Sequence, residues 1–237
     1  YSAAGVLAPN GKIYFAPHGA PRALVIDPQA ATAETIGPEP PGDAPKYSAA
    51  GVLAPNGKIY FAPYGASHAL VIDPNRSTAE ILGPRLPGQL QYEAPGVLAR
   101  NGKIYFAPSG AFRALVIDPC ASTAEELGPQ FPGPCKYVAA GVLAPNGKIY
   151  FAPYRESRAL VIDPLASTAE MLGPELPGNL GKYAAAGVLA DSGRIYFAPH
   201  SADRTLIIDP RTSTVEMHGP EAPGCFQYSA AGVLAPN

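Results

Sequence analysis

The stretch YSAAGVLAPNGKIYFAP occupies residues 1–17 and returns, letter for letter, at residues 47–63. The same unit begins again, with a few substitutions, at Tyr92, Tyr137 and Tyr183. Self-similarity at a fixed spacing of this length is typical of repeat architectures. The 237 residues therefore divide into five units, 1–46, 47–91, 92–136, 137–182 and 183–227, and a last segment, 228–237, that matches residues 1–10.

Each unit contains four short apolar runs separated by turn residues. In the first unit the runs are residues 3–8, 12–16, 23–26 and 32–36. Asn10-Gly11 suits the two positive-φ positions of a type I′ hairpin, and Asp27-Pro28 suits the start of a β-turn. Proline recurs too often for helices of ordinary length. The pattern predicts four short strands per unit.

The middle runs are apolar on both faces. Ile13 and Phe15 point to one side of the expected sheet, and Tyr14 points to the other. A lone four-stranded sheet cannot bury both faces, so neighbouring sheets have to cover them. Four strands in a unit of roughly 45 residues fit a propeller blade. We therefore expect an all-β fold, a single-domain five-bladed β-propeller with four antiparallel strands per blade, the small-residue run innermost and the polar fourth run at the rim.

The pattern GVLAPNGKIYFAP…ALVIDP…STAE resembles the blades of YVTN-type and NHL-type propeller repeats, and it covers the whole chain. Those families often close with six or seven blades, so five-bladed lectins of the tachylectin kind are a closer match in geometry. The resemblance implies the propeller but not a function, because propellers host enzymes, lectins and scaffolds. We expect residues 228–237 to act as an extra first strand in ring closure, with one of the two copies (1–10 or 228–237) completing the first blade and the other placed elsewhere or paired with a second molecule.

The charge balance argues against a nucleic acid partner, and the length of the apolar runs argues against a membrane span. Charged residues make up only 15% of the chain and the net charge is −2, so no basic excess drives phosphate binding and we expect no nucleic acid partner. No apolar run approaches the roughly 20 residues of a membrane helix, so we expect no membrane span. The three cysteines fall at separate places and are predicted to be free thiols, which leaves the compartment undecided.

The sequence contains few candidate catalytic groups. The innermost run contains one acid, Glu93, and one carboxylate makes neither a metal cage nor the acid pair of a glycosidase. Histidine is scarce and has no zinc-site spacing, and no glycine-rich phosphate loop opens a helix. The acids that precede proline are interpreted as turn caps: Asp27, Asp73, Asp118, Asp163 and Asp209. We therefore expect no catalytic residue, no metal and no cofactor.

The loop between the second and third runs varies most among the units. It reads HGAPR (18–22), YGASH (64–68), SGAFR (109–113), YRESR (154–158) and HSADR (200–204). In a propeller it shares a face with the returning loop, whose last residues are Lys46, Gln91, Lys136, Lys182 and Gln227. Loops often carry binding, and Tyr and Arg are effective contact residues. The alternative is ordinary drift of exposed loops. The candidate ligand-binding residues are His18, Arg22, Tyr64, His68, Arg113, Tyr154, Arg158, His200 and Arg204.

These observations predict a non-enzymatic binding or scaffold module with repeated sites on one mildly cationic face. Its ligand would be an unknown protein, peptide or carbohydrate, bound by several weak contacts that add through multivalency. A multivalent carbohydrate-binding lectin is the alternative within the binding class. A propeller hydrolase of the lactonase or glycosidase type is the disfavoured alternative in another class. A recently amplified or engineered array without an evolved ligand is a third possibility.

Overall fold

The computed structural model describes residues 3–178, 181–221 and 224–235, and this part of the chain contains twenty strands and no helix. The first blade consists of β1 (Val6–Leu7), β2 (Ile13–Phe15), β3 (Ala23–Asp27) and β4 (Thr32–Ile36). The second consists of β5 (Val52–Leu53), β6 (Ile59–Phe61), β7 (Ala69–Asp73) and β8 (Thr78–Leu82). The third consists of β9 (Val97–Leu98), β10 (Ile104–Phe106), β11 (Ala114–Asp118) and β12 (Thr123–Leu127). The fourth consists of β13 (Val142–Leu143), β14 (Ile149–Phe151), β15 (Ala159–Asp163) and β16 (Thr168–Leu172). The fifth consists of β17 (Val188–Leu189), β18 (Ile195–Phe197), β19 (Thr205–Asp209) and β20 (Thr214–His218).

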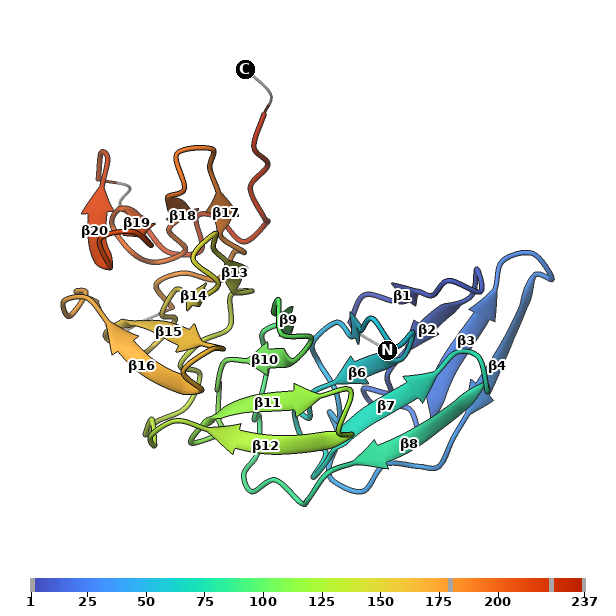
Figure 1. Ribbon diagram of the computed structural model, residues 1–237. Helices are drawn as coiled ribbons and strands as arrows, with labels where there is room; N and C mark the ends of the chain where they lie inside the picture. The colour runs from blue at the N-terminus through green and yellow to red at the C-terminus, as the bar shows by residue number, and fades with distance from the viewer. Residues whose placement is uncertain (1–2, 179–180, 222–223, 236–237) are drawn as a thin grey trace.

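Each unit forms one sheet whose strands are hydrogen-bonded in chain order, with all neighbouring pairs antiparallel. The blades follow one another along an arc, with the short first strands on its inner side and the fourth strands on its outer side (Figure 1). The predicted all-β propeller with five four-stranded blades is therefore confirmed. The small side chains of the first run suit the crowded inner side, and the polar fourth run faces outward.

The first hairpin of each blade differs in detail from the predicted type I′ turn. In the first blade, Gly11 has φ 79° whereas Asn10 is not in the left-handed region. The amide of Gly11 donates to the carbonyl of Ala8 at 3.0 Å, and the amide of Ala8 donates to Lys12 at 2.9 Å. This is a turn followed by a glycine bulge. Asn10 uses its side-chain oxygen to accept the amide of Lys12 at 3.1 Å, which holds the asparagine in place.

Apolar side chains seal each pair of neighbouring blades. One face of the first blade, with Tyr14 and Val25, packs against Ile59 and Phe61 of the second. The same arrangement joins the second to the third, the third to the fourth and the fourth to the fifth blade. We call the Tyr-bearing side of a blade its trailing face and the Ile/Phe-bearing side its leading face. Burial of both faces is what the sequence required of neighbouring blades.

Two sets of hydrogen bonds reinforce these contacts. Asn10 Nδ2 donates to the Tyr14 hydroxyl at 2.9 Å and, across the blade boundary, to the Pro74 carbonyl at 3.0 Å. The second, third and fourth blades repeat this link from Asn56, Asn101 and Asn146. A line of backbone bonds also passes from blade to blade. Its pairs, donor first, are Lys46–His18 (2.7 Å), Tyr64–Lys46 (2.8 Å), Gln91–Tyr64 (2.8 Å), Ser109–Gln91 (2.8 Å), Lys136–Ser109 (3.2 Å), Tyr154–Lys136 (2.7 Å), Lys182–Tyr154 (2.8 Å), His200–Lys182 (2.7 Å) and Gln227–His200 (2.8 Å).

The two ends of the arc are not sealed in this way. Within the described residues, no apolar cluster joins the fifth blade to the first. Phe15 is partly exposed on the leading face of the first blade, whereas its counterpart Phe61 is 1% exposed. The two end blades lie at opposite ends of the arc in Figure 1.

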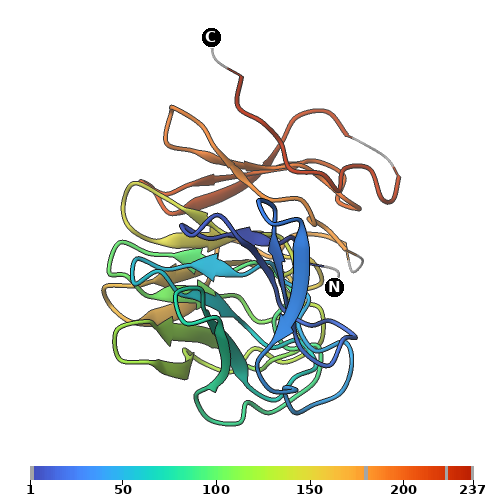
Figure 2. The ribbon, with the colours of Figure 1, turned by 90° about the vertical axis from the view of Figure 1, so that its right-hand side faces the viewer.

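The expected ring closure by the last segment is not observed. The first blade takes its innermost strand, β1, from its own unit, because the hairpin to β2 is local. Residues 228–235 form no strand, and Val233 is 91% exposed. This segment leaves beside the fifth blade, where Gly232 lies close to Val188 of β17, and then extends beyond the sheets in both views (Figures 1 and 2). Residues 1–2 and 236–237, which belong to the two copies of the repeat start, lie outside the described residues.

The uneven burial of equivalent phenylalanines predicts unequal effects of substitution. We expect Phe106→Ala to lower the free energy of unfolding by about 3–5 kcal/mol, because its ring fills the boundary between the second and third blades. We expect Phe15→Ala, at the same place in the repeat, to cost less than half as much in dilute solution. Urea unfolding followed by circular dichroism checks both values. Equal losses would show that the leading face of the first blade is covered.

Candidate functional site

Residues from four of the five units line a cavity of about 510 Å³ on the inner side of the arc, which we call the inner cavity. Its lining residues are Ser48, Tyr64, Glu93, Cys135, Val138, Tyr154, Arg155 and Ala184. Most of them sit directly after the tyrosine that opens each unit or in the variable loop. The backbone line described above passes through Tyr64 and Tyr154, and it therefore holds both of these residues at the cavity.

The cavity is asymmetric because single units depart from the repeat. Glu93 stands where the other units have Ser48, Val138 and Ala184. Arg155 stands where the second and third units have Gly65 and Gly110. A nearly symmetric scaffold thus presents one carboxylate and one guanidinium to the same cavity.

The Glu93 carboxylate is partly buried, and the Ser109 hydroxyl donates to its Oε2 at 3.3 Å. Burial raises the pKa of Glu93, because the charged form loses solvation, and the hydrogen bond from Ser109 opposes that rise. The carboxyl therefore holds a proton more tightly than an exposed glutamate. A carboxylate of this kind suits proton transfer with a bound molecule.

Tyr64 and Tyr154 contribute phenols to the cavity. Burial raises the pKa of Tyr64, and the negative charges of Glu93 and Cys135 add to the effect. Its phenol therefore keeps its proton near neutral pH. The ring of Tyr154 lies against Gly181, where an added Cβ would meet the ring at 2.6 Å. Arg155 donates its backbone amide to the Cys135 carbonyl at 3.1 Å, which places the exposed arginine beside the cavity.

The prediction of a mildly cationic face is wrong for the lysines that end the returning loops. Lys46, Lys136 and Lys182 are 6%, 1% and 1% exposed. Lys136 Nζ donates to the carbonyls of Ser109 (2.9 Å) and Gly133, and Lys182 Nζ donates to Gly178 at 2.8 Å. Burial lowers the pKa of Lys136, while the charge of Glu156 opposes the shift. Backbone carbonyls satisfy the ammonium groups of Lys136 and Lys182, whereas Lys46 Nζ pairs with the Glu39 carboxylate at 2.7 Å, and the three lysines brace the loops in this way.

The candidate arginines do not gather into one site. Arg113 donates to the Gly128 carbonyl at 2.9 Å, Arg158 pairs with Glu175 at 3.5 Å and Arg204 pairs with Glu221 at 3.0 Å. Each of these contacts lies within its own unit. Arg22 is exposed in the loop of the first unit.

The candidate histidines also stay apart. His18 Nδ1 lies 3.1 Å from the Tyr47 carbonyl, and His68 Nδ1 lies 2.9 Å from the Ser67 hydroxyl. His200 is buried, with Nδ1 at 3.0 Å from the Gly181 carbonyl, and its ring lies 5.8 Å from that of Tyr154. Of the nine candidate residues, only Tyr64 and Tyr154 line the inner cavity. Glu93 and Arg155 were missed, although each breaks the repeat at a position that is small elsewhere.

The aspartates that precede proline have the predicted structural role. Asp118 Oδ1 accepts the amides of Cys120 and Ala121 at 2.9 and 3.0 Å, and Oδ2 pairs with Lys103 at 3.0 Å. The same caps occur at Asp27, Asp73, Asp163 and Asp209. These carboxylates lie in the hairpin between the third and fourth strands, not at the inner cavity.

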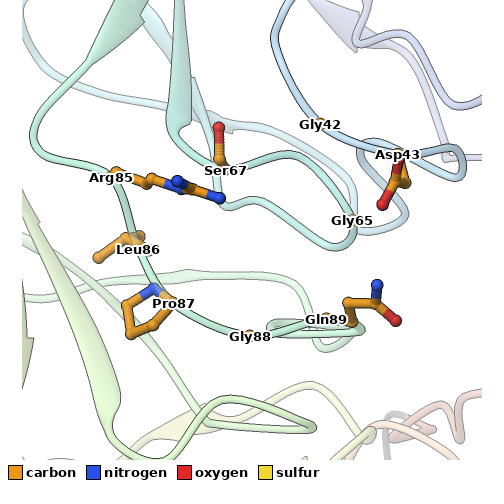
Figure 3. A pocket seen from close by; sticks show the side chains of 9 residues that line it. All are labelled: Gly42, Asp43, Gly65, Ser67, Arg85, Leu86, Pro87, Gly88 and Gln89. Carbon is orange, nitrogen blue, oxygen red and sulfur yellow. The ribbon is translucent and has the colours of Figure 1, made fainter.

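A second cavity, of about 470 Å³, lies between the connecting segments around the second blade. Three glycines line it: Gly42, Gly65 and Gly88. In Figure 3, Arg85 lies beside Ser67, while Asp43 lies at the other end of the opening, so the polar side chains do not converge on one point.

Within residues 3–178, 181–221 and 224–235, no three His, Cys, Asp or Glu side chains are placed to hold a metal ion. The same ranges contain no helix with the length and apolar character for crossing a bilayer. All three cysteines are free thiols.

A comparison with protein-family models finds no match, and a comparison with curated proteins finds none. Solved structures do match. A virginiamycin B lyase from Staphylococcus aureus aligns with a TM-score of 0.70 and 15% identity, over 98% of this chain and 74% of that chain. A catalytically inactive form of that lyase with quinupristin aligns at 0.69 and 14%, over the same shares of the two chains. A streptogramin B lyase aligns at 0.65 and 19%, over 96% and 72%. About a quarter of each lyase chain has no counterpart here.

This likeness shows the propeller fold, and it corrects the functional expectation. The prediction of a non-enzymatic binding or scaffold module is contradicted, because three of the solved propellers that this chain resembles in structure are lyases. The sequence argument required several acids or histidines on the innermost run. In the structure, Arg155 and Tyr154 of the fourth unit line the same cavity as the single carboxylate of Glu93.

The capped aspartates predict how stability responds to acid. The amide of Ala121, the amine of Lys103 and the amide of Cys120 hold the pKa of Asp118 below its ordinary value of 3.8, against a smaller opposing effect of burial. A carboxylate whose pKa is lower in the folded state stabilises the fold at pH values above its ordinary pKa. This contribution is lost as pH falls through the folded-state pKa. We expect Asp118→Asn to unfold with a shallower dependence on pH below about 4, where the wild type binds a proton on unfolding. Thermal melts across that range measure it, and parallel curves for the two proteins would contradict the assignment.

Proposed function

We propose that this protein is an enzyme of the lyase class, with the inner cavity as its active site and Glu93 as the general base. The observation that carries the proposal is the partly buried carboxylate of Glu93 in a cavity shared with Tyr64, Tyr154 and Arg155. The three lyase structures on the same fold support the reaction class.

A lyase breaks a bond by elimination and consumes no water in doing so. In the proposed step Glu93 removes a proton from a carbon of the substrate, and the electron pair released forms a new double bond as the leaving group departs. Arg155 stabilises negative charge that develops on a neighbouring carbonyl oxygen. Tyr64 donates its phenolic proton to the leaving group and regains one from solvent, and Glu93 releases to solvent the proton that it took from the substrate, so the proton count balances.

The substrate class that we propose is the one after which the structural neighbours are named, streptogramin B compounds. Cavity walls drawn from four units suit a bulky ligand that contacts several blades at once. Tyr64 and Tyr154 supply flat apolar surfaces with a polar end for such a ligand.

We expect the purified protein to convert virginiamycin B or quinupristin into products whose summed mass equals that of the substrate. Liquid chromatography with mass spectrometry reads this directly, because hydrolysis would add the mass of one water. Glu93→Gln should lower kcat/KM by at least about 100-fold, since it removes the base. Glu125→Gln, on the exposed outer strand of the same blade, is the matched control and should leave the rate unchanged. An inert wild-type protein, or an equally active Glu93→Gln, would refute the proposal.

The raised pKa of Glu93 predicts opposite trends for stability and activity. The folded protein favours the protonated form of the Glu93 carboxyl. The stability gained from this form is fully present at pH values below the ordinary pKa of 4.5, and it is lost as pH rises through the higher folded-state pKa. Activity should rise over the same interval, because the base has to be ionised. Glu93→Gln should therefore be at least as stable as the wild type at neutral pH, and the measurement is a melting curve taken alongside the pH–rate profile. A destabilised Glu93→Gln would assign the side chain a structural role.

A further inference from the structure

We propose a second ligand site at the boundary between the third and fourth blades, which binds a small carboxylate with an apolar body. A cavity of about 600 Å³ lies there, and we call it the hairpin pocket. Its lining includes Arg100, Asn101, Lys148, Asp163, Pro164 and Leu165. Pockets for small molecules measure roughly 300–1,000 Å³, so the volume suits such a ligand.

The hairpin pocket lies at the edge of the sheets opposite the inner cavity. It is formed by the β9–β10 hairpin of the third blade and, in the fourth blade, by the β13–β14 hairpin and the β15–β16 turn. Because the strands of a blade alternate in direction, these turns lie at one edge, and the variable loops between the second and third strands lie at the other. The two cavities share no lining residue, so the proposal is independent of the proposed function.

Two departures from the repeat meet at this boundary. Arg100 replaces the proline that three other units have, at Pro9, Pro55 and Pro145. Leu165 replaces the residue that follows the Asp-Pro turn in the other units, which is Gln29, Asn75, Cys120 or Arg211. Among the four boundaries between consecutive blades, this one combines a cation on the first hairpin with a large apolar side chain on the facing turn.

Arg100 gives the pocket a positive charge that an anion can neutralise. The other cation of the lining, Lys148, is already paired, because its Nζ lies 3.1 Å from Asp163 Oδ2. Arg100 is exposed, and no carboxylate in the part of the chain that the structure describes forms an ion pair with it. A guanidinium binds a carboxylate through two parallel N–H···O bonds, so a carboxylate is the anion that fits best.

Leu165 and Pro164 give the pocket an apolar side. Leu165 is 96% exposed. A single exposed leucine is common on protein surfaces, but this one lines the same pocket as the arginine. A hydrocarbon chain that covered Leu165 would remove this apolar surface from water. The pocket therefore matches a molecule with a carboxylate at one end and a hydrocarbon body at the other.

Hydrogen bonds hold the walls of the pocket in place. Asn101 Nδ2 donates across the blade boundary to the Pro164 carbonyl at 3.3 Å. The amide of Leu165 donates to Asp163 Oδ1 at 3.0 Å. The two backbone segments that carry Arg100 and Leu165 are thus fixed relative to each other before a ligand arrives. Binding then has to order little more than these two side chains, which keeps its entropic cost low.

Octanoate is the probe for the test, because it joins a carboxylate to an apolar chain. A titration of the full-length protein followed by two-dimensional ¹H–¹⁵N NMR should show saturable shifts at residues 100–102 and 163–166 and at the Arg100 side-chain Nε–H. Tyr64 and Arg155, which line the inner cavity, should shift less. Acetate lacks the apolar chain and 1-octanol lacks the charge, so each should bind at least about tenfold more weakly than octanoate.

Single variants test the two side chains separately. Arg100→Pro introduces the proline of three other units and should weaken octanoate binding at least about tenfold. Leu165→Asn copies the residue of the second unit and should weaken binding about threefold or more. The matched control is Arg76→Ala, which removes an exposed arginine from a turn at the same edge and should bind as the wild type does. Circular dichroism checks the fold, and Arg100→Gln serves if Arg100→Pro does not fold.

The repeat also allows the site to be copied. The boundary between the second and third blades has Pro55 and Cys120 at the two departing positions. It has the same asparagine link, from Asn56 Nδ2 to the Pro119 carbonyl at 3.1 Å. The double variant Pro55→Arg with Cys120→Leu should therefore bind a second octanoate, with new saturable shifts at residues 55–57 and 118–121.

Several results would overturn the proposal. They are a titration without saturable shifts at the hairpin pocket, unchanged octanoate affinity in Arg100→Pro, and acetate or 1-octanol binding as tightly as octanoate. A folded double variant that gains no second site would overturn it as well. Lyase activity is not a readout here, so the outcome is separate from that of the proposed function.

Discussion

Each blade of this protein has two apolar faces, and a single four-stranded sheet cannot keep both from water. The Tyr-bearing side of one blade and the Ile/Phe-bearing side of the next therefore close on each other at every internal boundary. This burial is the main favourable contribution to the fold, and the asparagine links and the line of backbone bonds then fix how the blades are aligned. The same constraint explains why Phe15 is partly exposed in the first blade, whereas Phe61, Phe106, Phe151 and Phe197 are buried between blades.

Repetition of one unit makes the scaffold regular, and the proposed active site lies where the regularity breaks. Ser48, Val138 and Ala184 line the inner cavity at one position of the repeat, and the third unit has Glu93 at that position. One acid in the third unit and one arginine in the fourth therefore change its character. Buried lysines such as Lys136 are braced by backbone carbonyls and hold the loops around it. Stability and the candidate chemistry thus come from separate residues of the same short repeat.

The architecture could be predicted in detail because its causes are local. Turn residues such as Asp118 and the alternation of Ile13, Tyr14 and Phe15 act over a few positions, and the structure confirms the strands that they predict. The candidate site could not be predicted in the same way. Glu93 was set aside as a single carboxylate, because the other residues at the cavity, Tyr64, Tyr154 and Arg155, come from other units. The lysines that end the returning loops were expected on an exposed cationic face, but they are buried in the structure.

The sequence by itself determined the number of blades, their four antiparallel strands, the innermost and outermost runs and the turn caps. These features follow from residue spacing and from the conformations that glycine, proline, asparagine and aspartate favour. Only the tertiary structure decided which residues share a cavity, that the arc carries an uncovered face at each end, and that residues 228–235 lie beside the fifth blade instead of in the sheet of the first. Those outcomes depend on the angle at which one sheet packs on the next. Many side-chain contacts between distant parts of the chain together set that angle.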